Sequence, residues 1–137
     1  MRLCSACLLG IPCRYDGKSK PNQKVLELAK NELLIPICPE QLGGLQTPRE
    51  GAEIIDGRVK TQSGEDRTQE FKQGAESVLL IAKTCGAKKA ILKQRSPSCG
   101  CGKIYDGSFS QKIIEGNGVT AKALIKEGIE VISEEDL

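Results

Sequence analysis

The chain contains no histidine among its 137 residues. This absence excludes Ser-His-Asp and Cys-His catalysis, histidine-ligated zinc and histidine-ligated haem. Aromatic residues are scarce as well, at 3% of the sequence, so we expect an aliphatic core. Any metal centre in this protein must therefore depend on sulfur and oxygen ligands.

Long apolar runs and a strong net charge are also missing. No stretch approaches the roughly 18 to 20 apolar residues that a membrane span needs. The first residues, Met1-Arg2-Leu3-Cys4, lead into a predicted strand and not into an export signal. We therefore expect a cytoplasmic protein with no membrane anchor. A net charge of +2 is too small to indicate a nucleic-acid-binding protein by itself.

Cysteine is the residue that stands out by its number, with seven in the chain. Seven thiols cannot all pair within one molecule, and a reducing compartment keeps most of them reduced. Metal binding or catalysis therefore explains these cysteines better than a disulfide framework. The length of 137 residues is enough for one domain, which we place at residues 1–137.

Apolar periodicity divides the chain into alternating strands and helices. Strands are predicted at 3–8, 33–37, 88–93 and 129–132, and helices at 23–31, 68–84 and 119–127. This order predicts an α/β fold, a small Rossmann-like three-layer sandwich with a mostly parallel four-stranded sheet and helices on both faces. Residues 38–66 are predicted to form a long functional loop with a small hairpin at 54–59, and a second loop follows the third strand.

Three cysteines each follow a predicted strand: Cys7, Cys38 and Cys99. Because the carboxyl ends of parallel strands gather along one edge of a sheet, we expect these thiols to meet there. Three thiolates in one crevice would form a metal or cluster site with one coordination position open. Of the other cysteines, Cys4 and Cys85 are predicted to be structural. Cys13 and Cys101 lie in the same two loops as the candidate ligands, and their role stays open between a fourth ligand, a redox pair and a bystander.

The spacing of the candidate ligands bears on which centre they would hold. Structural zinc usually takes four ligands in closely spaced pairs. Cys4-Ser5-Ala6-Cys7 has such a spacing, but an extended strand would point the two side chains apart. A four-iron, four-sulfur cluster held by three cysteines instead leaves one iron free to act as a Lewis acid.

Five ordered motifs along the chain resemble the thiouracil desulfidase family: Ser5-Ala6-Cys7-Leu8-Leu9-Gly10, Arg14-Tyr15-Asp16-Gly17, Cys38-Pro39-Glu40 with Gly43-Gly44-Leu45 and Pro48-Arg49, Gly64-Glu65-Asp66-Arg67-Thr68, and Lys93 through Ser96-Pro97-Ser98-Cys99-Gly100 to Tyr105-Asp106-Gly107. The resemblance implies a 4Fe-4S cluster on Cys7, Cys38 and Cys99. It also implies removal of sulfur from thiouracil or a thiolated uridine, with release of the oxygenated base and sulfide. In this family the catalytic carboxylate and serine would correspond to Glu40 and Ser96.

The residue types at these positions suit that chemistry. A thiocarbonyl sulfur bound to the open iron would leave the adjacent ring carbon easier to attack. Glu40 would act as a general base that deprotonates a water, or would relay a proton to the ring. Ser96 would hydrogen-bond the base or the developing tetrahedral centre. The alternatives are that Glu40 only accepts backbone N–H bonds and that Ser96 is an ordinary turn residue before Pro97.

Four basic residues are candidates for holding the pyrimidine carbonyls or a nucleotide phosphate, although each could be a solvated surface charge: Arg14, Arg49, Lys93 and Arg95. Among the aromatic residues, only Tyr15 and Tyr105 are expected near the strand ends. The expected substrate is a small thiolated pyrimidine or nucleoside. The small net charge disfavours tRNA, and the sequence does not determine the oligomeric state.

Two other classes of function stay open at this point. The first is a thiol redox or sulfur-transfer protein that uses Cys99 and Cys101 without iron. The second is a non-enzymatic cluster or zinc module that binds a partner.

Overall fold

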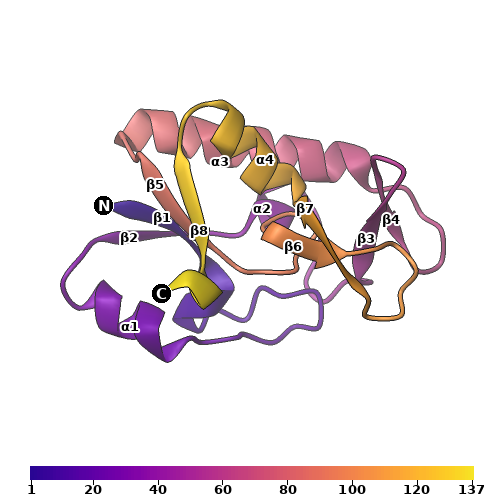
Figure 1. Cartoon of the computed structure of the whole chain (residues 1–137), viewed down its shortest axis with the longest axis horizontal. Helices are drawn as coiled ribbons and strands as arrows, with labels where there is room; N and C mark the ends of the chain where they lie inside the picture. The colour runs from indigo at the N-terminus through magenta and orange to yellow at the C-terminus, as the bar shows by residue number, and fades with distance from the viewer.

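A computed structural model describes the whole chain, residues 1–137, around a four-stranded parallel sheet with the order β2-β1-β5-β8 (Figure 1). Its strands are β1 (Arg2–Ser5), β2 (Leu34–Ile37), β5 (Lys89–Leu92) and β8 (Glu130–Ser133). Every neighbouring pair runs parallel, with Leu3 opposite Ile35 on one side and opposite Ala90 on the other. The predicted parallel sheet is therefore confirmed.

Helices cover both faces of this sheet, as expected for a three-layer sandwich. One face is covered by α1 (Gln23–Ala29), and the other by α3 (Thr68–Cys85) and α4 (Val119–Lys126) (Figure 1). Side chains of a strand alternate between the faces, so Ala90 and Leu92 belong to the core beneath α3 and α4, while Ile91 belongs to the core beneath α1. None of the helices combines the length and apolar character that crossing a bilayer requires.

The core is aliphatic, as the composition predicts. Phe71 is the one aromatic residue among the buried side chains, and neither of the two core clusters contains an aromatic residue. Val, Leu, Ile and Ala from strands and helices fill both sides of the sheet. The other three aromatic residues of this protein therefore lie outside the buried core.

The first predicted strand is shorter than the apolar run that suggested it. β1 ends at Ser5, and Ala6–Leu9 form a 3₁₀ helix, η1, which stops at Gly10 with a φ of 97°. The prediction of a strand through Leu8 is wrong because a short apolar run has no periodicity that separates strand from helix. Cys7 consequently lies on η1.

The segment predicted as a long loop contains a helix and a hairpin. The short helix α2 (Pro39–Leu42) follows Cys38 directly and begins with proline, a favoured first helical residue. The hairpin of β3 (Ala52–Ile55) and β4 (Arg58–Thr61) is longer than predicted at both ends. Its turn residues Asp56 and Gly57 both have positive φ, at 49° and 76°, which matches the twist of a two-residue hairpin.

A second hairpin lies in the other segment predicted as loop. It pairs β6 (Cys101–Tyr105) with β7 (Ile113–Asn117) in antiparallel register. The sequence of β7 does not predict this hairpin, because it lacks the apolar–polar alternation of a strand. Ile113 and Ile114 are adjacent and each is 46% exposed, and Gly116 and Asn117 disfavour strands. The final turn of the chain is a second 3₁₀ helix, η2 (Glu134–Asp136).

Two glycines allow α2 to lie directly against α3. A Cβ atom added at Gly43 would lie 2.0 Å from the Glu70 carbonyl oxygen, and one at Gly74 would lie 2.0 Å from the Pro39 carbonyl oxygen. No larger residue fits at either position without moving a backbone. This contact fixes the place of α2, and with it the place of Cys38 and Glu40.

Candidate metal centre and active site

The carboxyl ends of β1, β2 and β5 surround a cavity of about 500 Å³. β1 and β5 are neighbours in the middle of the sheet. The chain leads from β1 outward to β2 at one edge, and from β5 outward to β8 at the other edge. The crevice between two such strands is where open α/β sheets bind their ligands. The cavity therefore lies where this fold places functional sites.

The cysteines that follow the three strands all line this cavity. Cys7 reaches it from η1, Cys38 from the junction of β2 and α2, and Cys99 from the loop after β5. Cys7 and Cys99 are buried, and Cys38 is half-buried. The pKa of Cys99 is raised to about 12, chiefly by burial; a hydrogen bond with the Ser5 side chain opposes this increase, and the neighbouring charges of Cys7 and Cys38 contribute to it. The three thiols are thus close enough to influence one another.

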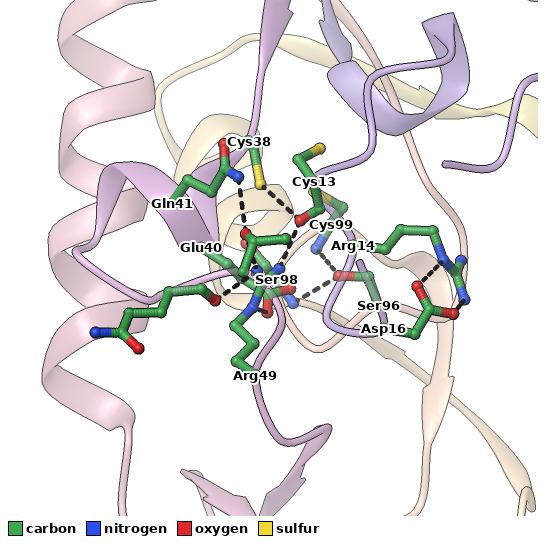
Figure 2. Close-up of polar contacts among 12 residues, drawn as sticks. Cys13, Arg14, Asp16, Cys38, Glu40, Gln41, Arg49, Ser96, Ser98 and Cys99 are labelled. Carbon is green, nitrogen blue, oxygen red and sulfur yellow. Dashed lines mark hydrogen bonds and ion pairs between the residues drawn. The ribbon is translucent and has the colours of Figure 1, made fainter. Parts of the chain in front are cut away.

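Cys38 differs from the other two in its electrostatic surroundings. The pKa of Cys38 is lowered to about 6, chiefly by a hydrogen bond from the Cys13 side chain. Burial opposes this decrease, whereas the Gln41 backbone N–H and the Arg49 cation contribute to it. As a thiol, Cys38 donates to the Cys13 carbonyl oxygen at 3.7 Å (Figure 2). Burial raises the pKa of Cys7 to about 11, although Lys93 and Arg14 oppose this increase.

The donor set fits a cluster better than a single ion. No three side chains of His, Cys, Asp or Glu lie close enough together to share one metal ion. In an iron–sulfur cluster each thiolate binds a different iron, so the sulfur atoms are spread around the group and do not converge on one point. Three cysteines around one cavity, with no imidazole in the chain, can hold such a cluster with one iron left without a protein ligand.

Glu40 lies on α2 at the edge of the cavity and is paired with Arg49 (Figure 2). The Arg49 Nε donates to Glu40 Oε1 at 2.9 Å, and the Arg49 side chain is only 9% exposed. The same guanidinium donates to the Cys13 carbonyl at 3.0 Å and to Gln46 and Thr47. Glu40 therefore accepts a hydrogen bond from a cationic side chain. The alternative, in which Glu40 accepts only backbone N–H bonds, does not apply.

Ser96 lines the cavity and also organises the loop that carries Cys99. Its Oγ accepts hydrogen bonds from the backbone N–H groups of Ser98 at 3.1 Å and Cys99 at 3.0 Å (Figure 2). Ser96 therefore stabilises the turn before Cys99, as the alternative for this residue expects. Since both contacts use the oxygen as acceptor, the hydroxyl hydrogen remains able to donate to a molecule in the cavity.

All four basic candidates line the cavity, and each is paired with a carboxylate. Lys93 Nζ lies 2.9 Å from Glu134, and both side chains are largely buried. Arg14 pairs with Asp16 at 3.3 Å, and Arg95 pairs with Glu135 at 3.0 Å; Arg49 pairs with Glu40. These pairs compensate the positive charge of the four candidate residues.

The remaining cysteines lie in different surroundings. Cys13 is buried and lines the cavity beside Cys38, whereas Cys101 lies outside it and donates to the Val131 carbonyl at 3.4 Å. Cys4 is fully buried in β1, as predicted. Cys85 is exposed at the end of α3, so the prediction that it is structural, which requires it to be packed in the interior, is wrong. All seven cysteines are free thiols.

Several residues that sequence reasoning missed also line the cavity. Tyr15 and Tyr105 are there as expected, and they are joined by Glu53 from β3 and by Phe109 from the loop between β6 and β7. Neither Glu53 nor Phe109 belongs to a motif with a recognisable spacing. Only the packing of the two hairpins against the sheet edge brings these residues to the site.

The fold and the site define a parallel α/β protein with a thiol-lined cavity at its strand ends. Comparison with known proteins shows that the chain belongs to the 2-thiouracil desulfurase family, whose model matches residues 3–136. The chain is 46% identical to the Bacillus subtilis (strain 168) protein YbbK, over all of this chain and 97% of that protein. It is also similar to the solved structure of the [4Fe-4S]-dependent thiouracil desulfidase TudS, with 44% identity, a TM-score of 0.94, and coverage of 99% of this chain and 91% of that one.

Proposed function

We propose that this protein is a 4Fe-4S-dependent desulfidase that removes sulfur from a thiolated pyrimidine by hydrolysis, giving the oxygenated base and sulfide. The observation that carries the proposal is that Cys7, Cys38 and Cys99 line one cavity together with Glu40 and Ser96. Membership of the 2-thiouracil desulfurase family and the likeness to the thiouracil desulfidase TudS support it.

In this proposal Cys7, Cys38 and Cys99 hold the cluster. When bound, the cluster supplies a Lewis-acidic iron with a free position that suits a soft thiocarbonyl sulfur. The cysteines come from three separate crossover units of the fold, so the folded sheet, and not the local sequence, brings the ligands together. The lowered pKa of Cys38 favours its thiolate, the form that binds iron.

Glu40 is the proposed general base. Arg49 occupies its Oε1 atom and fixes the direction of the carboxylate, which leaves Oε2 to accept a proton from a water molecule. Positioning a proton acceptor in this way typically contributes a factor of about 10² to 10⁴ to a rate.

Ser96 is the proposed hydrogen-bond donor to the reacting ring. The backbone N–H groups of Ser98 and Cys99 hold its oxygen in place, so the hydroxyl hydrogen can point into the cavity. A donor fixed in advance stabilises charge that develops on a substrate oxygen or nitrogen during attack. Because Cys99 is part of this arrangement, Ser96 and a proposed cluster ligand are positioned by the same turn.

The substrate we propose is a small molecule, a thiolated pyrimidine base or nucleoside. A cavity of about 500 Å³ falls in the range that accommodates compact organic ligands. The four basic candidates around it, Arg14, Arg49, Lys93 and Arg95, are paired with carboxylates, which offers little attraction for the backbone of a long RNA.

Anaerobic reconstitution with iron and sulfide, followed by addition of 2-thiouracil, tests this function. We expect absorption and electron paramagnetic resonance signals of a 4Fe-4S cluster, and release of sulfide with formation of uracil. A colourless protein with a titratable disulfide or persulfide would instead support the thiol redox alternative. A cluster without sulfide release would support the non-enzymatic module.

Two cysteine variants make the same experiment specific. Cys99→Ala should lose the cluster, because this thiol lines the cavity with the other two proposed ligands. Cys101→Ala should keep both cluster and activity, since Cys101 lies outside the cavity and contacts Val131. Loss of activity in the Cys101 variant with the cluster intact would favour a redox pair of Cys99 and Cys101.

A further inference from the structure

The few aromatic residues of this protein are gathered at one place. The chain has two tyrosines, two phenylalanines and no tryptophan. Phe71 is buried outside the cavity, and the other three line the cavity: Tyr15, Tyr105 and Phe109. Because the composition is so poor in aromatic rings, their presence around a single cavity indicates a ligand with a flat face.

Phe109 is held there in an uncommon backbone conformation. It lies in the loop between β6 and β7 with a φ of 57°, and Gln111 two residues later has a φ of 64°. Residues with side chains seldom adopt this left-handed region, so the surrounding structure must hold the loop in place. Such outliers gather at ligand-binding sites, where geometry is set by function as well as by folding.

The contact that holds the loop is a carboxylate on the neighbouring hairpin. Glu53 Oε1 accepts hydrogen bonds from the backbone N–H groups of Gly107 at 3.0 Å and Phe109 at 3.1 Å. Glu53 is buried, on β3, and none of the ion pairs of this protein includes it. At Gly107 an added Cβ would lie 2.8 Å from the Ile54 carbonyl oxygen, so the two hairpins are in direct backbone contact. Figure 1 shows both hairpins at the same end of the molecule.

The two tyrosines are held differently from Phe109. Tyr15 is 46% exposed, its ring lies 3.5 Å from where a Cβ at Gly51 would be, and the Arg14 guanidinium is 5.5 Å from the ring centroid. Tyr105 is part of the regular strand β6, opposite Ile113. Phe109 is the aromatic residue whose backbone is tied down specifically at the cavity by a buried side chain.

We propose that Phe109 stacks on the pyrimidine ring of the substrate and that Glu53 is the positioning residue that keeps Phe109 at the cavity. The identity of the ring rests on the proposed function. Stacking on an aromatic side chain recognises the flat face that every pyrimidine has, whichever of its carbonyl positions carries sulfur. Phe109 therefore determines affinity for the ring, and the other residues of the site determine which bond is broken.

The absence of tryptophan from the chain allows a direct binding test. Phe109→Trp places a single fluorescent indole at the proposed stacking position. In the reconstituted protein, uracil, the expected product, should quench this fluorescence with a saturable dependence on concentration. Leu33→Trp is the matched control, because Leu33 is 67% exposed and lies outside the cavity. Its fluorescence should change only linearly, by collision and absorption of light. Equal linear responses in both variants would overturn the proposal.

Kinetics with 2-thiouracil give the second test. Phe109→Leu should raise KM about tenfold, a conservative value for one lost base–aromatic stack, and leave kcat within about twofold. Phe109→Tyr should remain close to the parent protein. An unchanged KM in the leucine variant would contradict the stacking role. If the parent protein releases sulfide but these variants behave like it, only the inference on Phe109 fails; if the parent releases none, the proposed function fails.

The role of Glu53 has its own comparison, made in the Phe109→Trp protein. Adding Glu53→Gln retains an oxygen that can accept both backbone hydrogen bonds, so saturable quenching by uracil should remain. Adding Glu53→Ala removes the acceptor and should abolish it. A thermal melt of both proteins verifies that each is folded. Retained quenching in a folded Glu53→Ala protein would show that Glu53 does not position Phe109.

Discussion

A single guanidinium, that of Arg49, joins the parts of the site that carry charge. It contacts the Glu40 carboxylate and the Cys13 carbonyl oxygen, and that carbonyl in turn lies 3.7 Å from the Cys38 sulfur. Its positive charge helps to lower the pKa of Cys38 and so favours the Cys38 thiolate. The sequence makes Arg49 a candidate for binding substrate, but its hydrogen bonds are all directed at the protein's own groups.

Replacing the Glu40 carboxylate by an amide tests its proposed role as the general base. Glu40→Gln keeps an oxygen that can accept from Arg49 but cannot take up a proton from water, so turnover should fall by about 10² to 10⁴. The absorption spectrum of the cluster should not change. Sulfide release from 2-thiouracil measures the first effect. Glu50→Gln, at an exposed carboxylate bound to Ser63, is the control that should retain activity. A fully active Glu40→Gln protein would remove Glu40 from the mechanism.

The second prediction concerns the thiols of the cluster-free protein. Only the thiolate reacts with iodoacetamide, and the pKa of Cys38 is lowered to about 6 whereas that of Cys7 is raised to about 11. Alkylation of Cys38 should therefore reach half its maximal rate near pH 6, and Cys7 should remain unmodified at pH 7. Peptide mass spectrometry after timed labelling distinguishes the two sites.

Cys13 supplies the control for this titration. A hydrogen bond from the Cys13 side chain is the main cause of the low pKa of Cys38, so Cys13→Ala should move the alkylation midpoint upward towards the ordinary range of a thiol. A midpoint that stays near pH 6 in this variant would show that Arg49 and the Gln41 N–H suffice.

At the scale of elements, the contact between α2 and α3 matters more than its small size suggests. α2 has only four residues, too few to be stable by itself, and it is held by backbone contact at Gly43 and Gly74. Because Cys38 and Glu40 belong to this element, its attachment to α3 determines where a proposed ligand and the proposed base lie.

This contact predicts the effect of a very small substitution. Alanine usually stabilises a helix relative to glycine by up to about 1 kcal/mol, but Gly74→Ala places a Cβ 2.0 Å from the Pro39 carbonyl oxygen. We expect a loss of roughly 2 to 3 kcal/mol in the free energy of unfolding, measured by urea denaturation, and weaker cluster retention. Glu76→Ala, at an exposed position of the same helix, should leave stability nearly unchanged. Equal stability of both variants would contradict the close contact.

The hairpins show which elements a sequence reveals. The β3–β4 hairpin is predictable because Asp56-Gly57 is a turn sequence between apolar residues, a signal that is entirely local. The β6–β7 hairpin escapes prediction because a seven-residue connection separates its strands and β7 lacks alternation. It is held by contacts with the rest of the fold, such as the Glu53 hydrogen bonds to its loop, which no local pattern contains.

At the scale of the whole molecule, the end of the chain is part of the support of the site. Glu134, in η2 after the last strand, accepts the Gln94 backbone N–H at 2.7 Å and pairs with Lys93 at 2.9 Å. Lys93 follows β5 and lines the cavity, where its charge opposes the rise in the pKa of Cys7. The last residues of the chain thereby influence a proposed ligand at its beginning.

Removing the Glu134 carboxylate, the partner of Lys93, should destabilise the protein as a whole. Glu134→Ala leaves the largely buried Lys93 side chain without its carboxylate partner, for which we expect a loss of about 3 kcal/mol in the free energy of unfolding. The exposed pair of Lys83 and Glu127, 3.8 Å apart, provides the contrast: Glu127→Ala should have almost no effect. Thermal melts of the three proteins measure both, and similar melting temperatures would show that the buried pair contributes little.

The sequence alone determined the class of fold and the family. Alternating apolar patterns are short-range, so they predicted the strands, the crossover helices and the parallel sheet, and the motifs around Cys7, Cys38 and Cys99 predicted the family that comparison confirms. The assignment of these cysteines, Glu40 and Ser96 to their roles stays a prediction. The absence of histidine limits the possible chemistry through composition alone.

Only the tertiary structure decided which side chains meet. The pairing of Arg49 with Glu40, the hydrogen bond from Cys38 Sγ to the Cys13 carbonyl oxygen and the attachment of Phe109 through Glu53 join residues on different segments of the chain. Such contacts depend on how the elements pack in three dimensions. The physical reason is that periodicity along a chain reports which face of an element is buried, whereas the distance between two elements is set by the balance of contacts over the entire fold.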